Sequence, residues 1–201
     1  MSEPYEIIVA PFEVYLAPVG EAWPDVDTTP AGNWVKLGTN GKRNIADGGV
    51  TVTHEQTIVE KRNVGSTGPI KAVRTEEKMT ISLTLEDLSL EQYAKALNNV
   101  TVTDTAAGSG TPGYRKIPLR QGNDVSLFAL LLKGTASAYG DGLSAQYQVP
   151  VCYQSDNPAP VFNKADVAAL KLTFSALEDP NAASDDVRFG NLVMQDAAAL
   201  P

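Results

Sequence analysis

A strict alternation of apolar and polar side chains from Met79 to Glu86 limits the folds that this chain can adopt. Successive side chains of a β-strand point to opposite faces, so the pattern predicts a strand with one buried face and one polar face. A second segment, from Val50 to Ile58, shows the same period. The two segments predict the halves of a long β-hairpin, and their polar sets are Thr51, Thr53, Glu55 and Thr57, and Thr80, Ser82, Thr84 and Glu86.

The segment between the two strands, residues 61–75, has no clear period and contains Gly65, Gly68 and Pro69. It carries four basic residues and no acidic one. The sequence therefore predicts a protruding basic loop, and its cations are Lys61, Arg62, Lys71 and Arg74.

The remaining patterns predict further short strands and one helix. Ser89 followed by Gln92 is a capping box, which predicts a short amphipathic helix over residues 89–98. Pro150, inside an alternating segment, indicates an edge position or a bulge. Further strands are expected at residues 6–17, 34–38, 126–133, 145–153 and 170–176.

These elements predict a mainly β fold, a β-sandwich or barrel with one short flanking α-helix. We expect a single domain over residues 1–180, because the Pro- and Gly-rich turns recur along this whole length. Residues 181–201 are rich in Ala and Asp, and we expect them to form a C-terminal arm or tail that is disordered or orders on a neighbour.

The composition argues against catalysis, metal binding and tight nucleic-acid binding. The net charge of −8 has the wrong sign for a protein that binds the phosphates of nucleic acid. Cys152 is the only cysteine and His54 the only histidine, which argues against a cysteine-based zinc site, a redox pair and a histidine-based catalytic triad. The G-x-G-x-x-G sequence at 108–113 is not followed by the helix that a dinucleotide site requires, because Pro112 and Pro118 bracket too short a stretch. It therefore predicts a surface turn. We therefore expect no catalytic, metal or cofactor residues. The acidic residues near the hairpin are interpreted as solvated surface groups, and the aromatic residues Trp34, Tyr147 and Tyr153 as core residues.

Nothing in the sequence indicates secretion or a membrane anchor. The first six residues lack a basic and an apolar region, and no apolar run reaches the length of a membrane span. We expect the protein to be made in the cytoplasm.

The order of several segments resembles the major tail tube proteins of long-tailed, siphophage-type bacteriophages. The segments are VYLAPVG at 14–20, WVKLG at 34–38, GVTVTHE at 49–55, the loop at 61–75, the strand at 79–85 and the helix at 88–97. The resemblance covers roughly the first hundred residues.

The resemblance implies a structural virion protein that self-assembles into hexameric rings, in which inner hairpin strands join a ring-shaped barrel. The rings would stack into a tail tube through which DNA is ejected. It implies that the polar hairpin residues Thr51 to Thr57 and Thr80 to Glu86 line the lumen. The implied partners are other copies of the chain, the tail terminator, tape measure and tail tip proteins, and DNA that passes transiently and without specificity.

We further expect the basic residues of the loop to contact acidic surface of a neighbouring subunit, for which the acidic N-terminal region is a candidate; the alternative is a mobile solvated loop. Two other functions stay open. One is the inner tube of a contractile tail or type VI secretion apparatus, which shares the fold. The other is a carbohydrate-binding or adhesive β-sandwich, which would expose aromatic residues on a strand face.

Overall fold

The computed structural model describes residues 12–197, with the exception of residues 136, 141, 161, 163, 165 and 166. Strands account for 44% of the structure and helices for 7%, so the predicted mainly β class is confirmed. The strands are β1 (Glu13–Ala17), β2 (Val35–Lys36), β3 (Ile45–Lys61), β4 (Lys71–Leu85), β5 (Thr103–Thr105), β6 (Tyr114–Lys116), β7 (Phe128–Gly134), β8 (Ala145–Gln154), β9 (Leu170–Ala176) and β10 (Asn191–Met194). The helices are α1 (Leu90–Ala96) and two short 3-10 turns, η1 (Gly41–Asn44) and η2 (Asp185–Val187).

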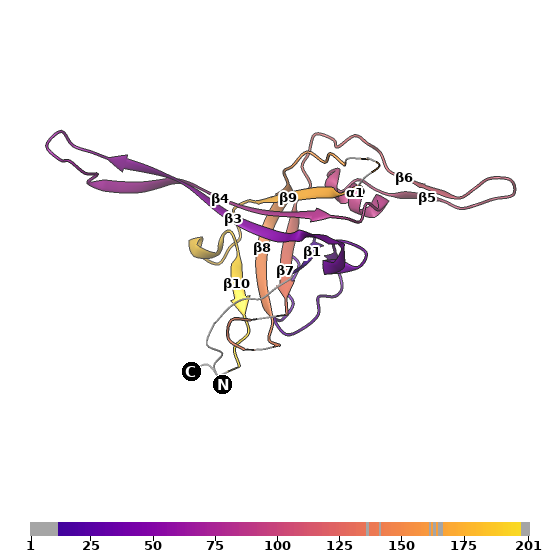
Figure 1. The fold of residues 1–201 in the computed structure, drawn as a ribbon, viewed down its shortest axis with the longest axis horizontal. Helices are drawn as coiled ribbons and strands as arrows, with labels where there is room; N and C mark the ends of the chain where they lie inside the picture. Colours follow the sequence, from indigo (N-terminus) through magenta and orange to yellow (C-terminus); the bar gives the residue numbers. More distant parts are fainter. Residues whose placement is uncertain are drawn as a thin grey trace.

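Eight strands form one antiparallel sheet in the order β2-β1-β7-β8-β9-β4-β3, and β10 pairs with β8 beside this path. Strand β8 holds the sheet together because it changes partners along its length. One edge pairs with β7, whereas the other pairs with β10 at residues 145–148 and with β9 at residues 152–154. The sheet therefore turns at β8, and β1 and β7 lie across from β4 and β9 (Figure 1).

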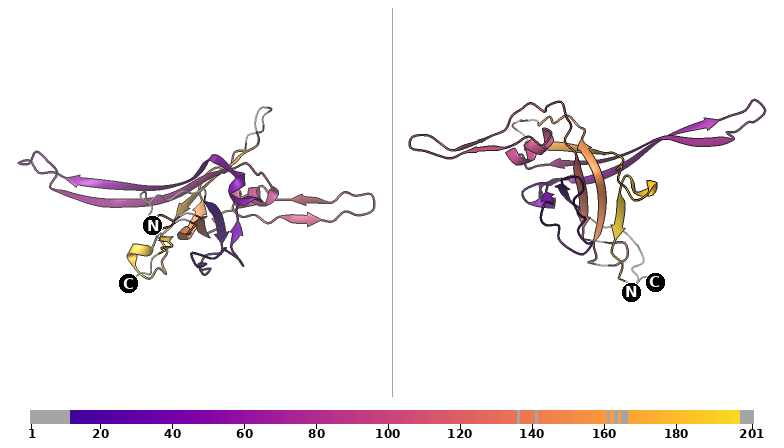
Figure 2. Two further views of the ribbon diagram at one scale, coloured as in Figure 1. Left: turned by 60° about the horizontal axis from the view of Figure 1, so that its bottom comes forward. Right: turned by 180° about the vertical axis from the view of Figure 1, so that it is seen from behind.

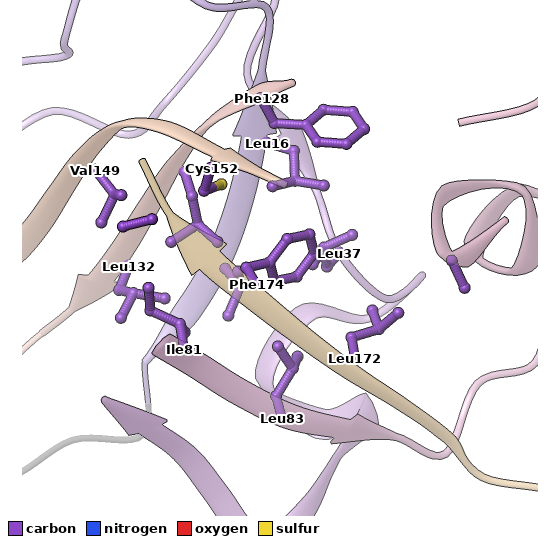
Figure 3. Packing of buried hydrophobic residues seen from close by; sticks show 14 of the residues in the cluster. Leu16, Leu37, Ile81, Leu83, Phe128, Leu132, Val149, Cys152, Leu172 and Phe174 are labelled. Carbon is purple, nitrogen blue, oxygen red and sulfur yellow. The ribbon is translucent and has the colours of Figure 1, made fainter. Parts of the chain in front are cut away.

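The main core fills the space between these two parts of the sheet. Ile81 and Leu83 of β4 and Phe174 of β9 face Leu16 and Leu132 of β1 and β7 (Figure 3). Each of these side chains is at most 3% exposed. The alternation in β4 therefore reports burial of one face, as the sequence predicts.

Pro150 lies inside β8, and its missing N–H is accommodated by a bulge. Leu130 pairs with Val149 and Phe128 pairs with Cys152, so the single residue Ala129 of β7 lies opposite both Pro150 and Val151 of β8. Of the two expected positions for this proline, the bulge is the one observed.

The long connection from β1 to β2 covers the opposite face of β1 and β7. Trp34 packs against Trp23 with ring centroids 5.1 Å apart, and its indole N–H donates to the Ala22 carbonyl at 3.0 Å. The Lys133 ammonium donates to the carbonyls of Val26 and Thr28 in the same connection. Trp34 is buried against Tyr15 and Leu131, so it belongs to the core, as expected for this aromatic residue.

Two hairpins project from the body on opposite sides (Figures 1 and 2). The longer one is the distal part of β3–β4, and the shorter one is β5–β6 with its connection. The strands of the long hairpin extend to Lys61 and from Lys71, so only residues 62–70 connect them. The expected loop at 61–75 is thus shorter than predicted, because the ladder continues past an irregularity in register between Thr57 and Ile58.

The expected helix is confirmed as α1, where the Ser89 hydroxyl accepts from the Gln92 N–H. The C-terminal segment differs from the expected arm. Residues 191–194 form β10 and pair with β8 of the same chain, and Asp179 N–H donates to the Arg188 carbonyl at 3.0 Å. The apolar cluster around Leu192 that the sequence shows near its end completes this sheet. Residues 1–11, which include part of the expected first strand, lie outside the described residues.

We expect Leu172→Ala to lower the free energy of unfolding by about 2–5 kcal/mol, because Leu172 is fully buried in the main core. Leu119→Ala is the matched control, since Leu119 is 73% exposed and its loss should change stability by less than about 0.5 kcal/mol. Urea unfolding followed by circular dichroism measures both. Equal stability of the two variants would contradict the described core.

Candidate functional site

The most distinctive surface of the described chain is the outer face of β3 and β4. The ladder places Thr53 opposite Thr80 and Thr51 opposite Ser82, so these hydroxyl side chains share one face. Their alternate neighbours, Val52 and Ile81, point to the core side. We call this outer surface the hydroxyl face.

Strand β9 extends the hydroxyl face by one more strand. Thr80 pairs with Ser175, Ser82 with Thr173, and Thr84 with Lys171. Ser175 is only 3% exposed and its hydroxyl donates to the Ser155 hydroxyl at 2.9 Å, so β9 adds Thr173 and Lys171 to the surface. The sequence shows that Lys171, Thr173 and Ser175 point away from the core, but it does not show which strand lies beside β4. The pairing of β4 with β9 is therefore the step that sequence reasoning missed.

Towards the free end of the hairpin the same face becomes charged in both signs. Glu55 lies opposite Lys78, and the Thr57 hydroxyl donates to the Glu76 carboxylate at 3.1 Å. Glu86 follows directly after β4, where its N–H donates to the Asn44 carbonyl. All eight polar residues expected on this face lie on β3 and β4 or at the end of β4.

The charge of Lys171 is compensated within the hydroxyl face. Its ammonium lies 2.8 Å from the Asp156 carboxylate, to which the Thr173 hydroxyl also donates at 3.2 Å. The hydrogen bond from Lys171 is the main cause that lowers the pKa of Asp156. The carboxylate is therefore ionised at neutral pH, and the lysine adds no net charge to the face.

The four cations expected in the loop do not form one cluster. Lys61 and Lys71 are ladder partners at the end of the hairpin, on the same side as the hydroxyl face. Arg62 pairs with Glu60 at 2.9 Å, whereas Arg74 points to the other side and contacts Glu77 at 3.1 Å and Gln56 at 2.9 Å. Arg74 therefore belongs to the base of the ribbon and not to its tip.

A cleft of about 830 Å³ lies on this other side, between the hairpin and the C-terminal segment. His54, Arg74 and Met79 of the hairpin form one wall, and residues 185–192 form the opposite wall. Gly190 shapes the second wall: its φ is +104°, and a Cβ there would lie 1.8 Å from the Gln148 carbonyl oxygen. The close approach of the two backbones therefore requires glycine.

The residues considered for chemistry lie apart from one another. His54 is exposed on the hairpin, and burial raises the pKa of the Cys152 thiol to about 12, so this thiol stays protonated. The 108–113 sequence forms the tip of the β5–β6 hairpin, where Gly108 and Thr111 exchange backbone hydrogen bonds, as expected for a surface turn. Within the described ranges, no three His, Cys, Asp or Glu side chains gather as metal ligands would, and no helix has the length and apolar character of a membrane span.

No protein-family model matches the chain, and no curated protein sequence matches it either. Function must therefore be inferred from the two surfaces described above, the hydroxyl face and the projecting hairpin.

We expect Lys171→Met to raise the pKa of Asp156 towards its ordinary value of 3.8, because the main hydrogen-bond donor to the carboxylate is lost. A lowered carboxyl pKa contributes stability above that ordinary value, and this contribution is lost as the pH falls through the folded-state pKa. For this exposed pair it should stay below about 1 kcal/mol. Carbon-detected NMR titration of Asp156 measures the shift, with Lys116→Met as the control; an unchanged midpoint in Lys171→Met would contradict the pairing.

Proposed function

We propose that this protein is a structural subunit that self-assembles into rings, which stack into a phage tail tube for DNA. The tail-tube resemblance implies six subunits in each ring. The observation that carries the proposal is the hydroxyl face, which spans three adjacent strands and continues along a hairpin that projects beyond the body. In the proposed assembly, this face lines the lumen and the hairpin contacts a second copy.

The chemistry of the hydroxyl face suits a surface along which DNA slides. Duplex DNA carries one negative charge per about 1.7 Å of its axis, and cationic surfaces retain it by releasing counterions. The hydroxyl face offers Thr and Ser side chains, and its Lys171 is paired with Asp156 at 2.8 Å. Such a wall provides little electrostatic retention, which is what a conduit requires.

The projecting hairpin supports self-assembly for a second reason. An isolated two-stranded ribbon is only marginally stable in water, and this one exposes apolar residues on both faces. Ile58 and Val59 point to opposite sides of the ribbon, and they are 49% and 54% exposed. Contact with another molecule would bury them and stabilise the ribbon.

The edge of the sheet gives a third reason. Among the described strands, β3 is an edge strand along all of its residues Ile45–Lys61, and a long open edge is an aggregation hazard for a monomer. Closing that edge against the sheet of a neighbour, as in a ring-shaped barrel, would satisfy its backbone groups. A permanent contact of this type is expected to bury about 2,000 Å² or more.

We expect purified protein to form rings or hollow tubes of uniform bore as its concentration rises. Negative-stain electron microscopy with light scattering across a concentration series measures this. Monomeric particles at every concentration would contradict the proposal and favour an adhesive or carbohydrate-binding module.

We expect Thr80→Lys with Ser82→Lys to make assembled tubes retain duplex DNA, because six copies would place a ring of cations on the lumen. Retention should fall steeply with salt, as counterion release requires. Gel-shift and nuclease-protection assays on assembled tubes measure it. Thr103→Lys with Thr105→Lys, in the exposed strand β5, is the matched control. Equal retention by both variants would contradict a lumen position for the hydroxyl face.

A further inference from the structure

The cleft beside the hairpin has an acidic character that its own cations do not cancel. Four carboxylates line it, from Glu77, Glu178, Asp185 and Asp186, together with the guanidinium groups of Arg74 and Arg188. Arg188 contacts Glu178 at 3.2 Å and Asp185 at 2.8 Å, and Arg74 contacts Glu77. Two guanidinium groups cannot neutralise four carboxylates, so the cleft carries an excess of two negative charges.

The floor of the cleft is apolar and partly open. Val149 and Met79 are buried there, Phe189 is half-buried, and Leu192 of β10 is 42% exposed. Within the described part of the chain β10 pairs only with β8, so its outer edge is also without a strand partner. An occupant that fits this cleft combines positive charge with apolar side chains.

The tip of the long hairpin, residues 59–73, has this combination. It carries Lys61, Arg62 and Lys71 against the single carboxylate of Glu60, an excess of two positive charges. Its apolar residues have no cover in the described chain: Val64 is fully exposed and Ile70 is 54% exposed. The tip thus complements the cleft in both charge and polarity.

The tip of one chain cannot reach the cleft of that chain. The base of the hairpin forms a wall of the cleft, and the ribbon runs away from it into solvent (Figures 1 and 2). At about 3.3 Å per strand residue, Lys61 lies roughly 10 Å beyond Ile58, the ladder partner of Arg74 at the outer end of the cleft. Contact between the two surfaces therefore requires two molecules.

We infer that the cleft receives the hairpin tip of a second copy of this chain. This inference rests on the proposed self-assembly and names its contact surfaces, and it replaces the acidic N-terminal region as the partner of the tip. Because the tip and the cleft are different surfaces, the contact is heterologous, and each copy offers one of each. Repetition of such a contact builds rings or stacks.

The direct test is cross-linking between two full-length variants, Val64→Cys in the tip and Leu192→Cys in the cleft. The native Cys152 is buried, with its pKa raised to about 12, so it does not compete for a thiol reagent. The variants are mixed under assembly conditions and treated with a short bismaleimide, and products are identified by mass spectrometry. We expect a mixed dimer as the main product.

The matched control places the cysteine at the tip of the other hairpin instead. Ser109 is also exposed, at the end of β5–β6, and Ser109→Cys should give no mixed dimer with Leu192→Cys. Equal yields from the two tips would overturn the inference, as would dimers formed only between two Val64→Cys chains.

A second test uses charge. Reversal of the tip with Lys61→Glu and Lys71→Glu should weaken assembly about tenfold at low salt, and adding Asp186→Lys should restore part of this loss. Lys116→Glu on the opposite hairpin is the control, with circular dichroism to verify folding. Unchanged assembly of the tip variant would overturn the inference.

The outcomes separate this inference from the proposed function. Tubes without the mixed dimer overturn the tip contact and leave the tube proposal standing. A mixed dimer without rings or tubes supports the contact and contradicts the tube. Absence of both overturns both.

Discussion

Burial of one face of β4 is the constraint on which the rest of the structure depends. Ile81 and Leu85 are completely buried between the two parts of the sheet, and this fixes the register of β4 against both β3 and β9. Because side chains alternate, the same register places Thr80, Ser82 and Thr84 on the opposite face. A slip of one residue would move the hydroxyls into the core, so the polar face is as strongly specified as the core itself.

The core ends at Met79, yet the ladder between β3 and β4 continues to Lys61 and Lys71. Beyond Arg74 no other segment of the described chain packs on the ribbon (Figures 1 and 2). Val59 and Val73, which are ladder partners there, stay about half exposed. In this part of the ribbon the alternation of apolar and polar residues does not correspond to a buried face within the subunit. In the proposed assembly, contact with another copy buries these apolar residues.

The sequence predicted those parts of the fold that depend on local periodicity. The hairpin, the helix capped by Ser89 and the continuously apolar β7 follow from patterns within a few residues of each other. The strand order could not be predicted in this way, because the pairing of β4 with β9 joins residues far apart in the chain. For the same reason the contribution of Thr173 to the hydroxyl face, and the pairing of β10 with β8, emerge only from the structure.

The distribution of charge separates the two proposed roles of the subunit. The chain as a whole is acidic, with a net charge of −8, but the hydroxyl face pairs its Lys171 with Asp156 and presents mainly neutral groups. The hairpin tip and the cleft instead carry excess charge of opposite signs, two positive charges at the tip and two negative charges in the cleft. Attraction between copies then occurs at surfaces distinct from the face proposed for DNA, so assembly can be strong while contact with DNA stays weak. A chain that used one charged surface for both purposes would have to weaken its assembly in order to release DNA.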